Sequence, residues 1–315
     1  MVGVVDSSSI RRTILPFLVV LMLTGHLLAF FTVAVWSFTY VSTKYLLGDF
    51  TPPEILLVRL VIAVILLKIL APVHIAVHRR REVLFAGAGL TGICLYFILE
   101  NYALSFTTAS NVGVILALAP LFTAVAVWMF LKDRSIIGIC FIIGFLCALS
   151  GVALLSFRGS DVAINPLGDF LTVCACCVWA VYSVIIRKIS LLGLNVLAVT
   201  RRSMQWGILF ILPFLAVSDI NTQDFSRYVN ITYLANLFFL GIFASALCFA
   251  SWNYAVRCIG AVATSVYIYA GPLITVVFAS IVLNEQLNLW GIAGCILTLG
   301  GLILSSLPSL IRRKR

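Results

Sequence analysis

Two ionisable side chains fall inside long apolar stretches of the sequence. Glu100 is the only acidic residue well inside such a stretch, and Arg59 lies within another. Charged groups inside a bilayer are costly and commonly mark functional sites. If both stretches are helices, the two side chains lie at similar depth, near one end of each helix. They could form a structural ion pair, Glu100 could bind a proton or another cation, or the pair could be a gate that opens when Arg59 releases Glu100.

Aromatic side chains with polar tips lie near the middle of several apolar stretches. Trp36 and Tyr40 are one helical turn apart, and Trp179 and Tyr182 would share a helix face. Such rings suit a pocket for a solute that is part apolar and part polar, although each could also pack against lipid or another helix. An amide is included because facing it toward lipid is costly. The predicted substrate-binding residues are Trp36, Tyr40, Tyr96, Asn111, Trp179, Tyr182, Tyr267 and Tyr269.

Two prolines, Pro120 and Pro272, fall near the centres of apolar stretches. A proline inside a helix removes one backbone hydrogen bond and frees a carbonyl group. Broken helices form the binding sites of many transporters. Both prolines are therefore predicted helix breaks, with a simple kink as the alternative.

No pattern typical of an enzyme is present. The segment Gly87-Ala-Gly89-Leu-Thr-Gly92 matches the dinucleotide-binding fingerprint, but that motif works only between a strand and a helix. We interpret its glycines as helix-packing residues. The histidines, His26, His74 and His78, lack the spacing of a metal site, and the nine cysteines fall in apolar stretches, where they act as small buried side chains. We expect no catalytic residues, no metal and no cofactor.

The composition is that of a membrane protein. Of the 315 residues, 63% are hydrophobic and only 10% are charged, whereas soluble domains are about half apolar and about a quarter charged. The formal net charge of +10 comes from short clusters between apolar stretches, which indicates membrane topology rather than nucleic-acid binding. We expect a multi-pass protein of the cell (inner or plasma) membrane that contacts the lipid bilayer and no nucleic acid.

Apolar stretches of about 20 residues span a bilayer as helices, and the sequence contains ten of them. A lead-in at residues 14–24 could extend the first helix or lie in the membrane interface. Lys and Arg concentrate in alternate loops, which predicts that both termini are cytoplasmic. The predicted parts are a cytoplasmic N-terminus with the lead-in (1–26), two five-helix repeats (27–157 and 166–307) and a basic cytoplasmic tail (308–315). The predicted helices are Leu27–Leu47, Glu54–Ala71, Val83–Leu104, Thr108–Leu131, Ser135–Phe157, Leu167–Lys188, Asn195–Val217, Ile231–Val256, Ala261–Leu283 and Leu287–Leu307.

The two halves of the chain repeat each other at two offsets. At 143 positions, the matching pairs are Trp36 with Trp179, Lys44 with Arg187 and Arg59 with Arg202. At 152 positions, they are Asn101-Tyr102-Ala103 with Asn253-Tyr254-Ala255, and Pro120 with Pro272. Because each half has an odd number of helices, the second half enters the membrane from the opposite side. The expected fold is an all-α integral membrane protein with ten transmembrane helices in two inverted five-helix repeats.

One equivalent pair differs in charge, since Glu100 corresponds to Trp252 at the offset of 152. Trp252 would then face Arg202 and could hold it by a cation–π contact. The predicted coupling or gating residues are Arg59, Glu100, Arg202 and Trp252.

With these motifs the chain resembles the EamA family of the drug/metabolite transporter superfamily, from about Leu27 to Leu307. The resemblance rests on the paired Trp and Arg residues, on Asn-Tyr-Ala at the end of the third helix, on Leu118-Ala-Pro120-Leu with Ala270-Gly-Pro272-Leu, and on the stretch Leu283–Gly291. Asp133 departs from the pattern, because Glu is more usual there. The resemblance implies ten helices, alternating access and a small solute, such as an amino acid or a nucleotide-linked compound, that is often moved outward.

Together the residues and the resemblance lead us to expect a secondary transporter. It would export or exchange small organic metabolites such as amino acids, driven by protons, by another coupling ion or by the solute's own gradient. An uptake carrier for a nucleotide-like metabolite is the alternative within transport. An integral-membrane enzyme acting on lipids is the alternative outside it, and would need a cluster of His, Asp or Cys at one membrane face.

Overall fold

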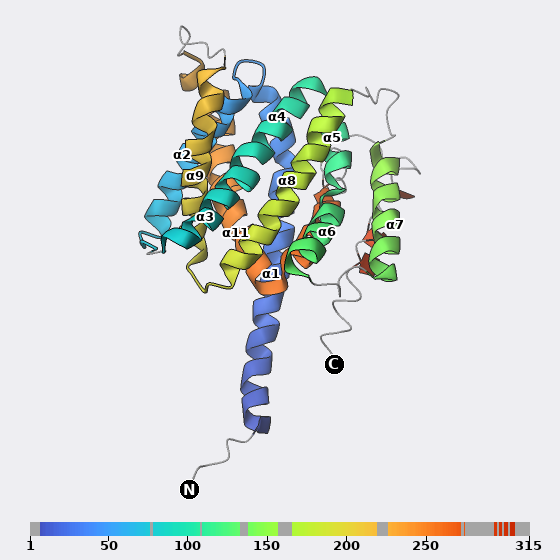
Figure 1. Ribbon diagram of the computed structural model, residues 1–315. Coiled ribbons are helices and arrows are strands. Elements are labelled where there is room, and N and C mark those ends of the chain that lie inside the picture. Colours follow the sequence, from blue (N-terminus) through green and yellow to red (C-terminus); the bar gives the residue numbers. More distant parts are fainter. Residues whose placement is uncertain are drawn as a thin grey trace.

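A computed structural model describes residues 7–75, 78–107, 109–132, 138–156, 166–218 and 226–271, and also residues 274, 293–294, 296–297, 299–301 and 303–305. Within these ranges, the side chains of residues 7–18, 109–111, 114, 152–153 and 155–156 are not described. The described chain is helical and contains no strand. Figure 1 shows its helices gathered into one bundle, from which the N-terminal part of the first helix projects.

The helices follow the apolar stretches of the sequence. Two long helices each contain a π-helical segment: η1 lies between α3 and α4, and η3 lies between α10 and α11. The α-helices are α1 (Ser7–Leu46), α2 (Pro52–Leu70), α3 (Arg79–Ala88), α4 (Tyr96–Phe106), α5 (Ala109–Leu116), α6 (Ala119–Leu131), α7 (Ile139–Ser156), α8 (Pro166–Ser190), α9 (Val196–Ala216), α10 (Ile231–Phe238), α11 (Cys248–Ile259) and α12 (Ala261–Ser265). The π-helical segments are η1 (Gly89–Leu95) and η3 (Phe239–Leu247), and the 3₁₀ segments are η2 (Ser226–Val229) and η4 (Val266–Tyr269).

These helices overlap the predicted spans. The lead-in at residues 14–24 is continuous with the first helix, which begins at Ser7 rather than at Leu27. Of the ninth predicted span, the structure describes residues 261–271 and 274. Within the tenth, the described residues between 293 and 305 are helical and pack on α7, with Gly301 against the Ala148 backbone.

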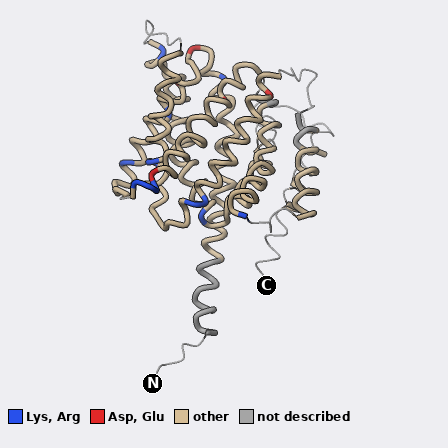
Figure 2. Tube along the Cα trace, viewed as in Figure 1, with Lys and Arg blue, Asp and Glu red and all other residues tan. Residues whose placement is uncertain are grey.

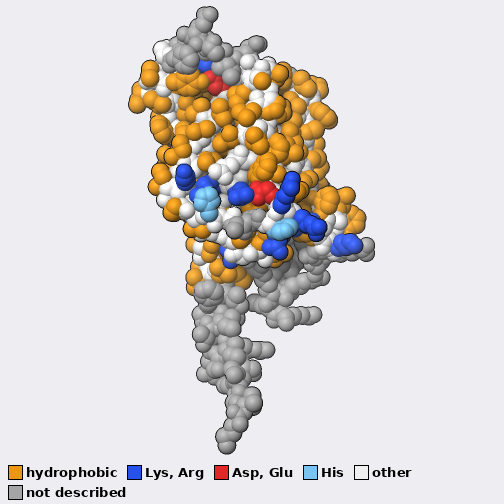
Figure 3. All heavy atoms as spheres, turned by 60° about the vertical axis from the view of Figure 1, so that its left-hand side comes forward, with side chains coloured by type: hydrophobic (Ala, Val, Ile, Leu, Met, Phe, Trp, Pro, Cys, Tyr) orange, Lys and Arg blue, Asp and Glu red, His pale blue; other side chains and the backbone are white. Residues whose placement is uncertain are grey.

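The surface of the bundle is suited to lipid. Within the described part of the chain, four continuous helices are long and apolar enough to cross a membrane: Val19–Leu46, Arg79–Phe106, Pro166–Ser190 and Ile231–Ile259. Two shorter helices, Ala119–Leu131 and Ile139–Gly151, are also apolar. Figure 2 shows that Lys, Arg, Asp and Glu gather toward the two ends of the bundle. Figure 3 shows a broad hydrophobic surface with a belt of Lys, Arg and His along its lower edge.

The same side-chain contact occurs in both halves of the chain. The ammonium group of Lys44, near the end of α1, donates a hydrogen bond to the Leu104 carbonyl at the end of α4. The guanidinium of Arg187, near the end of α8, donates to the Val256 carbonyl at 3.4 Å. These pairs are related by the offsets of 143 and 152 that relate the sequence repeats. Basic side chains commonly bind the free carbonyls at a helix C-terminus, so each half uses the same cap to join its first and third helices.

The two halves run in opposite directions. Along α1, Ser42 contacts Asn236 and Trp36 contacts Ala244, so α1 is antiparallel to α10–η3–α11. Helix α8 is likewise antiparallel to α3–η1–α4. Because α1 and α4 end together at the Lys44 cap, α1 and α8 are antiparallel, and in Figure 1 α1 runs upward where α8 runs downward.

Two glycines in the π-helical segments bring helix backbones very close together. A Cβ atom on Gly89 would lie 2.5 Å from the Ser203 carbonyl oxygen in α9, and one on Gly241 would lie 2.6 Å from Cβ of Ile62 in α2. The prediction that the Gly87–Gly92 glycines pack helices is therefore confirmed for Gly89. It also holds for Gly92, whose added Cβ would lie 2.1 Å from the Tyr182 ring.

These glycine contacts correct the alignment of the second and seventh helices. Gly241 approaches the Arg59 carbonyl and the Ile62 side chain, whereas Gly89 approaches the Ser203 carbonyl and the Trp206 side chain. Arg59 therefore corresponds in space to Ser203, an offset of 203 − 59 = 144, and the predicted match of Arg59 with Arg202 is wrong by one residue. One residue is a rotation of about 100° around a helix with 3.6 residues per turn, so Arg202 points in another direction.

The glycine contacts give a stability prediction. Gly89→Ala should lower the free energy of unfolding by about 1–3 kcal/mol, because the new methyl group overpacks a backbone contact. Gly113→Ala is the matched control, since a Cβ there meets nothing within 4 Å and alanine favours a helix over glycine. Thermal unfolding of the purified variants in detergent measures both effects. Equal stability of the two variants would contradict the close packing of η1 on α9.

Candidate functional site

Three tryptophans from three helices meet at the centre of the bundle. The ring centroids of Trp36 and Trp179 are 5.4 Å apart, those of Trp36 and Trp252 are 5.2 Å apart, and those of Trp179 and Trp252 are 5.5 Å apart. Phe249 touches two of them, at 5.4 Å from Trp36 and 6.0 Å from Trp179. We call the set the aromatic cluster, and its members are Trp36, Tyr96, Phe97, Trp179, Tyr182, Phe249 and Trp252.

The indole groups of the cluster differ in their hydrogen bonds. Nε1 of Trp36 donates to the Ala244 carbonyl, inside η3, at 2.9 Å. The Nε1 atoms of Trp179 and Trp252 are buried and have no hydrogen-bond partner. Nearly all buried polar groups in proteins are paired, so these two donors are available to a bound molecule or to a second conformation. π-helical segments such as η3 are themselves frequent at functional sites.

Glu100 lies next to the aromatic cluster. Its side chain is only 6% exposed, and its Oε1 accepts a hydrogen bond of 2.9 Å from the Tyr96 hydroxyl. Tyr40 lies within electrostatic reach of Glu100 and Tyr96. The structure thus brings together Trp36, Tyr40, Tyr96, Trp179 and Tyr182, five of the eight residues predicted to bind substrate.

Arg59 is buried against Phe97, with 1% of its surface exposed. Its Nε donates to the Ser245 hydroxyl at 2.8 Å, and its guanidinium carbon lies 4.2 Å from the Phe97 ring centroid. Its Nη2 has no hydrogen-bond partner. Arg59 and Glu100 interact electrostatically, but no nitrogen of one lies within 4.0 Å of an oxygen of the other. A direct ion pair, one of the three alternatives for these residues, is therefore absent, because Ser245 and Phe97 hold the arginine and Tyr96 holds the glutamate.

The predicted contact between Arg202 and Trp252 is also absent. Arg202 binds Glu82 through two nitrogens, with an Nη2 to Oε2 distance of 2.8 Å, and Trp206 donates to the same carboxylate at 2.7 Å. Trp252 instead packs in the aromatic cluster. The one-residue difference in register explains the error, since it turns Arg202 toward the start of α3.

Two other predicted site residues lie apart from the cluster. The Tyr267 hydroxyl is 2.9 Å from Nδ1 of His26 in α1, and the Tyr269 ring lies 6.5 Å from Phe145 in α7. Neither ring contacts the tryptophans. The prediction placed them in the cavity because they precede Pro272, whereas the 3₁₀ turns of η4 direct them toward other helices.

A helix break lies directly before Pro120. Helix α5 ends at Leu116, Ala117 and Leu118 form a turn, and Pro120 stands in the first turn of α6. The Cys176 thiol lies 3.5 Å from the Ile115 carbonyl at this break. Pro272 and the side chain of Asn111 lie outside the described part of the structure.

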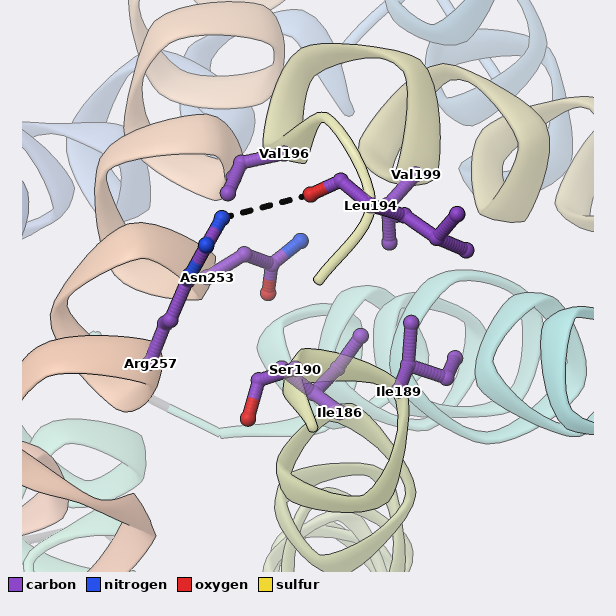
Figure 4. Close-up of a pocket in the computed structure, with 8 residues that line it drawn as sticks. All are labelled: Ile186, Ile189, Ser190, Leu194, Val196, Val199, Asn253 and Arg257. Carbon is purple, nitrogen blue, oxygen red and sulfur yellow. Dashed lines mark hydrogen bonds between the residues drawn. The ribbon is translucent and has the colours of Figure 1, made fainter. Parts of the chain in front are cut away.

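A small pocket opens at the ends of α8 and α11 (Figure 4). Arg257 closes one side of it by donating to the Leu194 carbonyl at 3.3 Å. Asn253, at its inner side, accepts from the Tyr182 hydroxyl at 2.8 Å and donates to Thr200 at 2.9 Å. Tyr182 belongs to the aromatic cluster, so one hydrogen bond links pocket and cluster. The pocket is lined by Ile186, Ile189, Ser190, Leu194, Val196, Val199, Asn253 and Arg257.

Two polar networks join the halves at opposite ends of α2. In the first, which we call the Glu54 clamp, Arg227 pairs with Glu54 at 2.7 Å, and the two side chains are 5% and 4% exposed. Tyr228 also donates to Glu54, and Tyr233 donates to Asp49. Burial and the neighbouring carboxylate raise the pKa of Tyr228 to about 12, so its hydroxyl keeps its proton at neutral pH.

The second network, which we call the Glu82 clamp, contains the Arg202, Trp206 and Glu82 contacts and the neighbouring Arg201. Arg201 donates to the carbonyls of Ala71 and Val73 at 2.6 and 2.7 Å. The Arg202–Glu82 pair is more open, at 33% and 20% exposed. Neither clamp was predicted from the sequence. The sequence feature that pointed to the clamps was the position of two acidic residues at helix starts. Glu54 is the one acidic residue in the first turn of α2, and Glu82 is the one in the first turn of α3.

No group of three or more His, Cys, Asp or Glu side chains that could hold a metal ion occurs among the described residues.

The comparison with known proteins agrees with this architecture. A model described as the EamA-like transporter family matches residues 23–157 and 166–307. The chain therefore belongs to the EamA-like transporter family, and the resemblance seen in the sequence motifs is confirmed. Its members are integral membrane proteins with several apolar helices, which makes this chain a membrane transporter by family.

Several full-length relatives carry transporter names. A protein named "Uncharacterized transporter" from Archaeoglobus fulgidus is 27% identical over 292 residues, covering 89% of this chain and 96% of the relative. A "Probable terminal-alkyne amino-acid exporter" from Streptantibioticus cattleyicolor is 26% identical, covering 90% and 93%. One crystal structure with 18% identity covers 90% of this chain and 98% of its own, with a TM-score of 0.70, which shows that the fold is shared.

The two equivalent tryptophans give a matched pair of variants. Trp36→Phe leaves the Ala244 carbonyl without its donor and should destabilise the protein by about 1–3 kcal/mol. Trp179→Phe removes a buried donor that has no partner, so it should be the milder change. Chemical or thermal unfolding in detergent compares them. A Trp179→Phe variant that is less stable than Trp36→Phe would contradict this assignment of hydrogen bonds.

Proposed function

We propose that the chain is a secondary transporter that exports or exchanges small organic metabolites, such as amino acids, by alternating access. Its two inverted five-helix repeats, residues 27–157 and 166–307, would supply ten transmembrane helices. One observation carries the proposal: the Lys44 and Arg187 caps repeat the same contact in two antiparallel halves, around a shared aromatic cluster. Two inverted halves can exchange conformations, which opens a central site first to one side and then to the other.

The charges support an orientation. Exposed basic residues lie at the end of the bundle that carries the Glu82 clamp, namely Arg79, Arg80, Arg81, Lys188 and Arg257. Cytoplasmic loops are rich in Lys and Arg, so we assign this end to the cytoplasm, together with both termini. The Glu54 clamp then faces the outside.

The clamps and the pocket support a sequence of states. The Glu54 clamp is closed and buried, whereas the pocket beside Arg257 opens at the cytoplasmic end. We propose that this pocket, which is too small for a solute in the described state, widens into a vestibule through which a solute approaches Tyr182 and the cluster. Opening to the outside would break the Glu54 clamp and close the vestibule. The glycine contacts of η1 and η3 would let the helices shift as rigid rods.

Glu100 is our candidate for the coupling residue. It is a buried carboxylate beside the proposed solute site, and its counterpart in the second half is Trp252, which cannot titrate. A single acid of this kind could carry one proton per cycle. Acidic residues inside membrane helices commonly serve proton relays.

The proposed function is tested by counterflow in liposomes, with a panel of amino acids and other metabolites, with and without a pH gradient. We expect exchange of at least one class of solute and an effect of the gradient on its accumulation. Absence of counterflow for the whole panel would contradict the transporter proposal.

The coupling role of Glu100 predicts a separation of two activities. Glu100→Gln is nearly isosteric and should keep solute exchange while abolishing accumulation driven by a pH gradient, because the amide cannot carry the proton. Exchange at equal pH serves as the internal control for folding. Unchanged gradient-driven accumulation in the variant would rule out Glu100 as the coupling residue.

The Glu54 clamp predicts charge-swap behaviour. Glu54→Arg or Arg227→Glu alone buries like charges and should slow exchange by about tenfold or more, since breaking a buried pair costs about 3–5 kcal/mol. The double swap restores an opposite pair and should recover much of the rate. Arg202→Glu with Glu82→Arg is the matched control, and its single changes should cost less because that pair is more exposed. A double variant as slow as the singles would contradict the clamp.

A further inference from the structure

Basic side chains gather on the surface where α2 ends and α3 begins. Lys68, in the last turn of α2, is exposed, and so are the three arginines in the first turn of α3. None of them forms an ion pair within the described part of the structure. Two exposed histidines lie between them along the chain. We call this set the α2–α3 basic patch, and its members are Lys68, His74, His78, Arg79, Arg80 and Arg81.

The patch has no free carboxylate of its own to balance its charge. Between Lys68 and Glu82, the only acidic residue in the sequence is Glu82 itself. Its carboxylate is already bound by two nitrogens of Arg202 and by the indole of Trp206, both from α9. The positive charge of the patch therefore remains available to an anionic partner from outside the chain.

The start of α3 is an unfavourable place for three positive charges, because the N-terminus of a helix carries a partial positive charge. The equivalent helix start in the second half, at the offset of 152, is Ile231–Tyr233 and carries no charge. Both starts are capped alike. The His78 side chain accepts from the Arg80 amide at 3.3 Å, and the Asn230 side chain accepts from the Thr232 amide at 2.9 Å. This helix start therefore folds without arginines, which indicates that their role lies outside the helix.

The patch borders a surface that is suited to lipid. Ile69, Leu70 and Val83, which flank the patch in sequence, are 71%, 51% and 71% exposed. Figure 3 shows a belt of Lys, Arg and His that runs along the edge of the broad hydrophobic surface. On α9, Trp206 stacks on Phe210 with ring centroids 5.8 Å apart, and tryptophan is enriched where a membrane meets water. A partner that fits this surface combines an anionic group with an apolar part.

We propose that the α2–α3 basic patch binds the headgroup of an anionic phospholipid. The phosphate of the lipid contacts the arginines at the start of α3, and its acyl chains lie against the apolar side chains beside them. Clusters of about four or more Lys and Arg residues next to a membrane helix commonly bind anionic lipids. A free phosphate ion would match the charge of the patch but not its apolar border. Lipid binding at this patch is independent of the solute and of the direction of transport.

The test measures lipid binding to the full-length protein in detergent by native mass spectrometry. Phosphatidylglycerol and phosphatidylcholine with the same acyl chains differ in the net charge of the headgroup. We expect phosphatidylglycerol to bind about tenfold or more tightly, because each basic residue adds to the attraction for an anionic lipid. Glycerol 1-phosphate, which has a similar anionic group and no acyl chains, should not displace the lipid at equal concentration. Displacement would show that the patch binds a free phosphate group and would overturn the proposal.

Double variants localise the binding. Arg80→Gln with Arg81→Gln removes two charges from the patch and should reduce the preference for phosphatidylglycerol by about fivefold or more. Arg80→Lys with Arg81→Lys keeps both charges and should retain most of the preference, which separates the effect of charge from that of folding. Lys132→Gln with Lys188→Gln is the matched control, since it removes two exposed charges at the ends of α6 and α8. It should leave the preference unchanged.

Two results would overturn lipid binding at this patch. One is equal affinity for the two lipids, and the other is an equal loss of preference in the glutamine variants of the patch and of the control. In either case the arginines would only orient the chain in the membrane. Because no solute takes part in the measurement, absence of counterflow in liposomes would contradict the transporter proposal and leave lipid binding standing.

Discussion

The low polarity of the bundle interior is the constraint on which the rest of this structure depends. A guanidinium and a carboxylate buried there are costly unless each is satisfied, and the chain satisfies them only in part. Ser245, Phe97 and Tyr96 supply neutral partners to Arg59 and Glu100. They hold the two charges in place without letting them neutralise each other. The surrounding helices, the π-helical segments and the clamps can all be understood as the frame that keeps this arrangement away from lipid and water.

The contacts between helices in this frame are equivalent in the two halves, whereas its centre, where the solute is proposed to bind, differs between them. The Lys44 and Arg187 caps, and the Gly89 and Gly241 contacts, are equivalent in the two halves. The centre is not equivalent, since Arg59 and Glu100 correspond to Ser203 and Trp252. The clamps are also unequal, with a buried pair at Glu54 and a more exposed pair at Glu82. Inverted halves allow one state open to the cytoplasm and one open to the outside. The unequal clamps would set the relative free energies of these two states.

The sequence was most informative where a single residue type has one dominant physical role. Apolar stretches predicted the helices, Pro120 predicted the break between α5 and α6, and the paired tryptophans led to the aromatic cluster. Membership of the EamA-like transporter family was visible in the same motifs. These features depend on local composition and spacing, which a linear sequence displays directly.

Features that depend on the rotation of one helix against another were harder to predict. A one-residue error in aligning α2 with α9 turned Arg202 toward the wrong neighbour, because one residue rotates a helix face by about 100°. The missing ion pair between Arg59 and Glu100 reflects competition from Ser245, which lies 186 residues from Arg59 in the sequence, and from Tyr96, which lies one helical turn before Glu100 on α4. Tyr267 and Tyr269 were misplaced because the 3₁₀ turn of η4 changes the direction of their side chains. The clamps join helical residues that are more than a hundred positions apart in the sequence, and no local pattern predicts such contacts.

The most direct test of the central claim is an experimental structure of the protein with bound 4-bromo-L-phenylalanine, in which anomalous scattering locates the bromine. The account predicts a bromine peak in the aromatic cluster, beside Trp36 and Trp179. A peak confined to the vestibule beside Arg257 or to the lipid-facing surface, with none at the aromatic cluster, would contradict it.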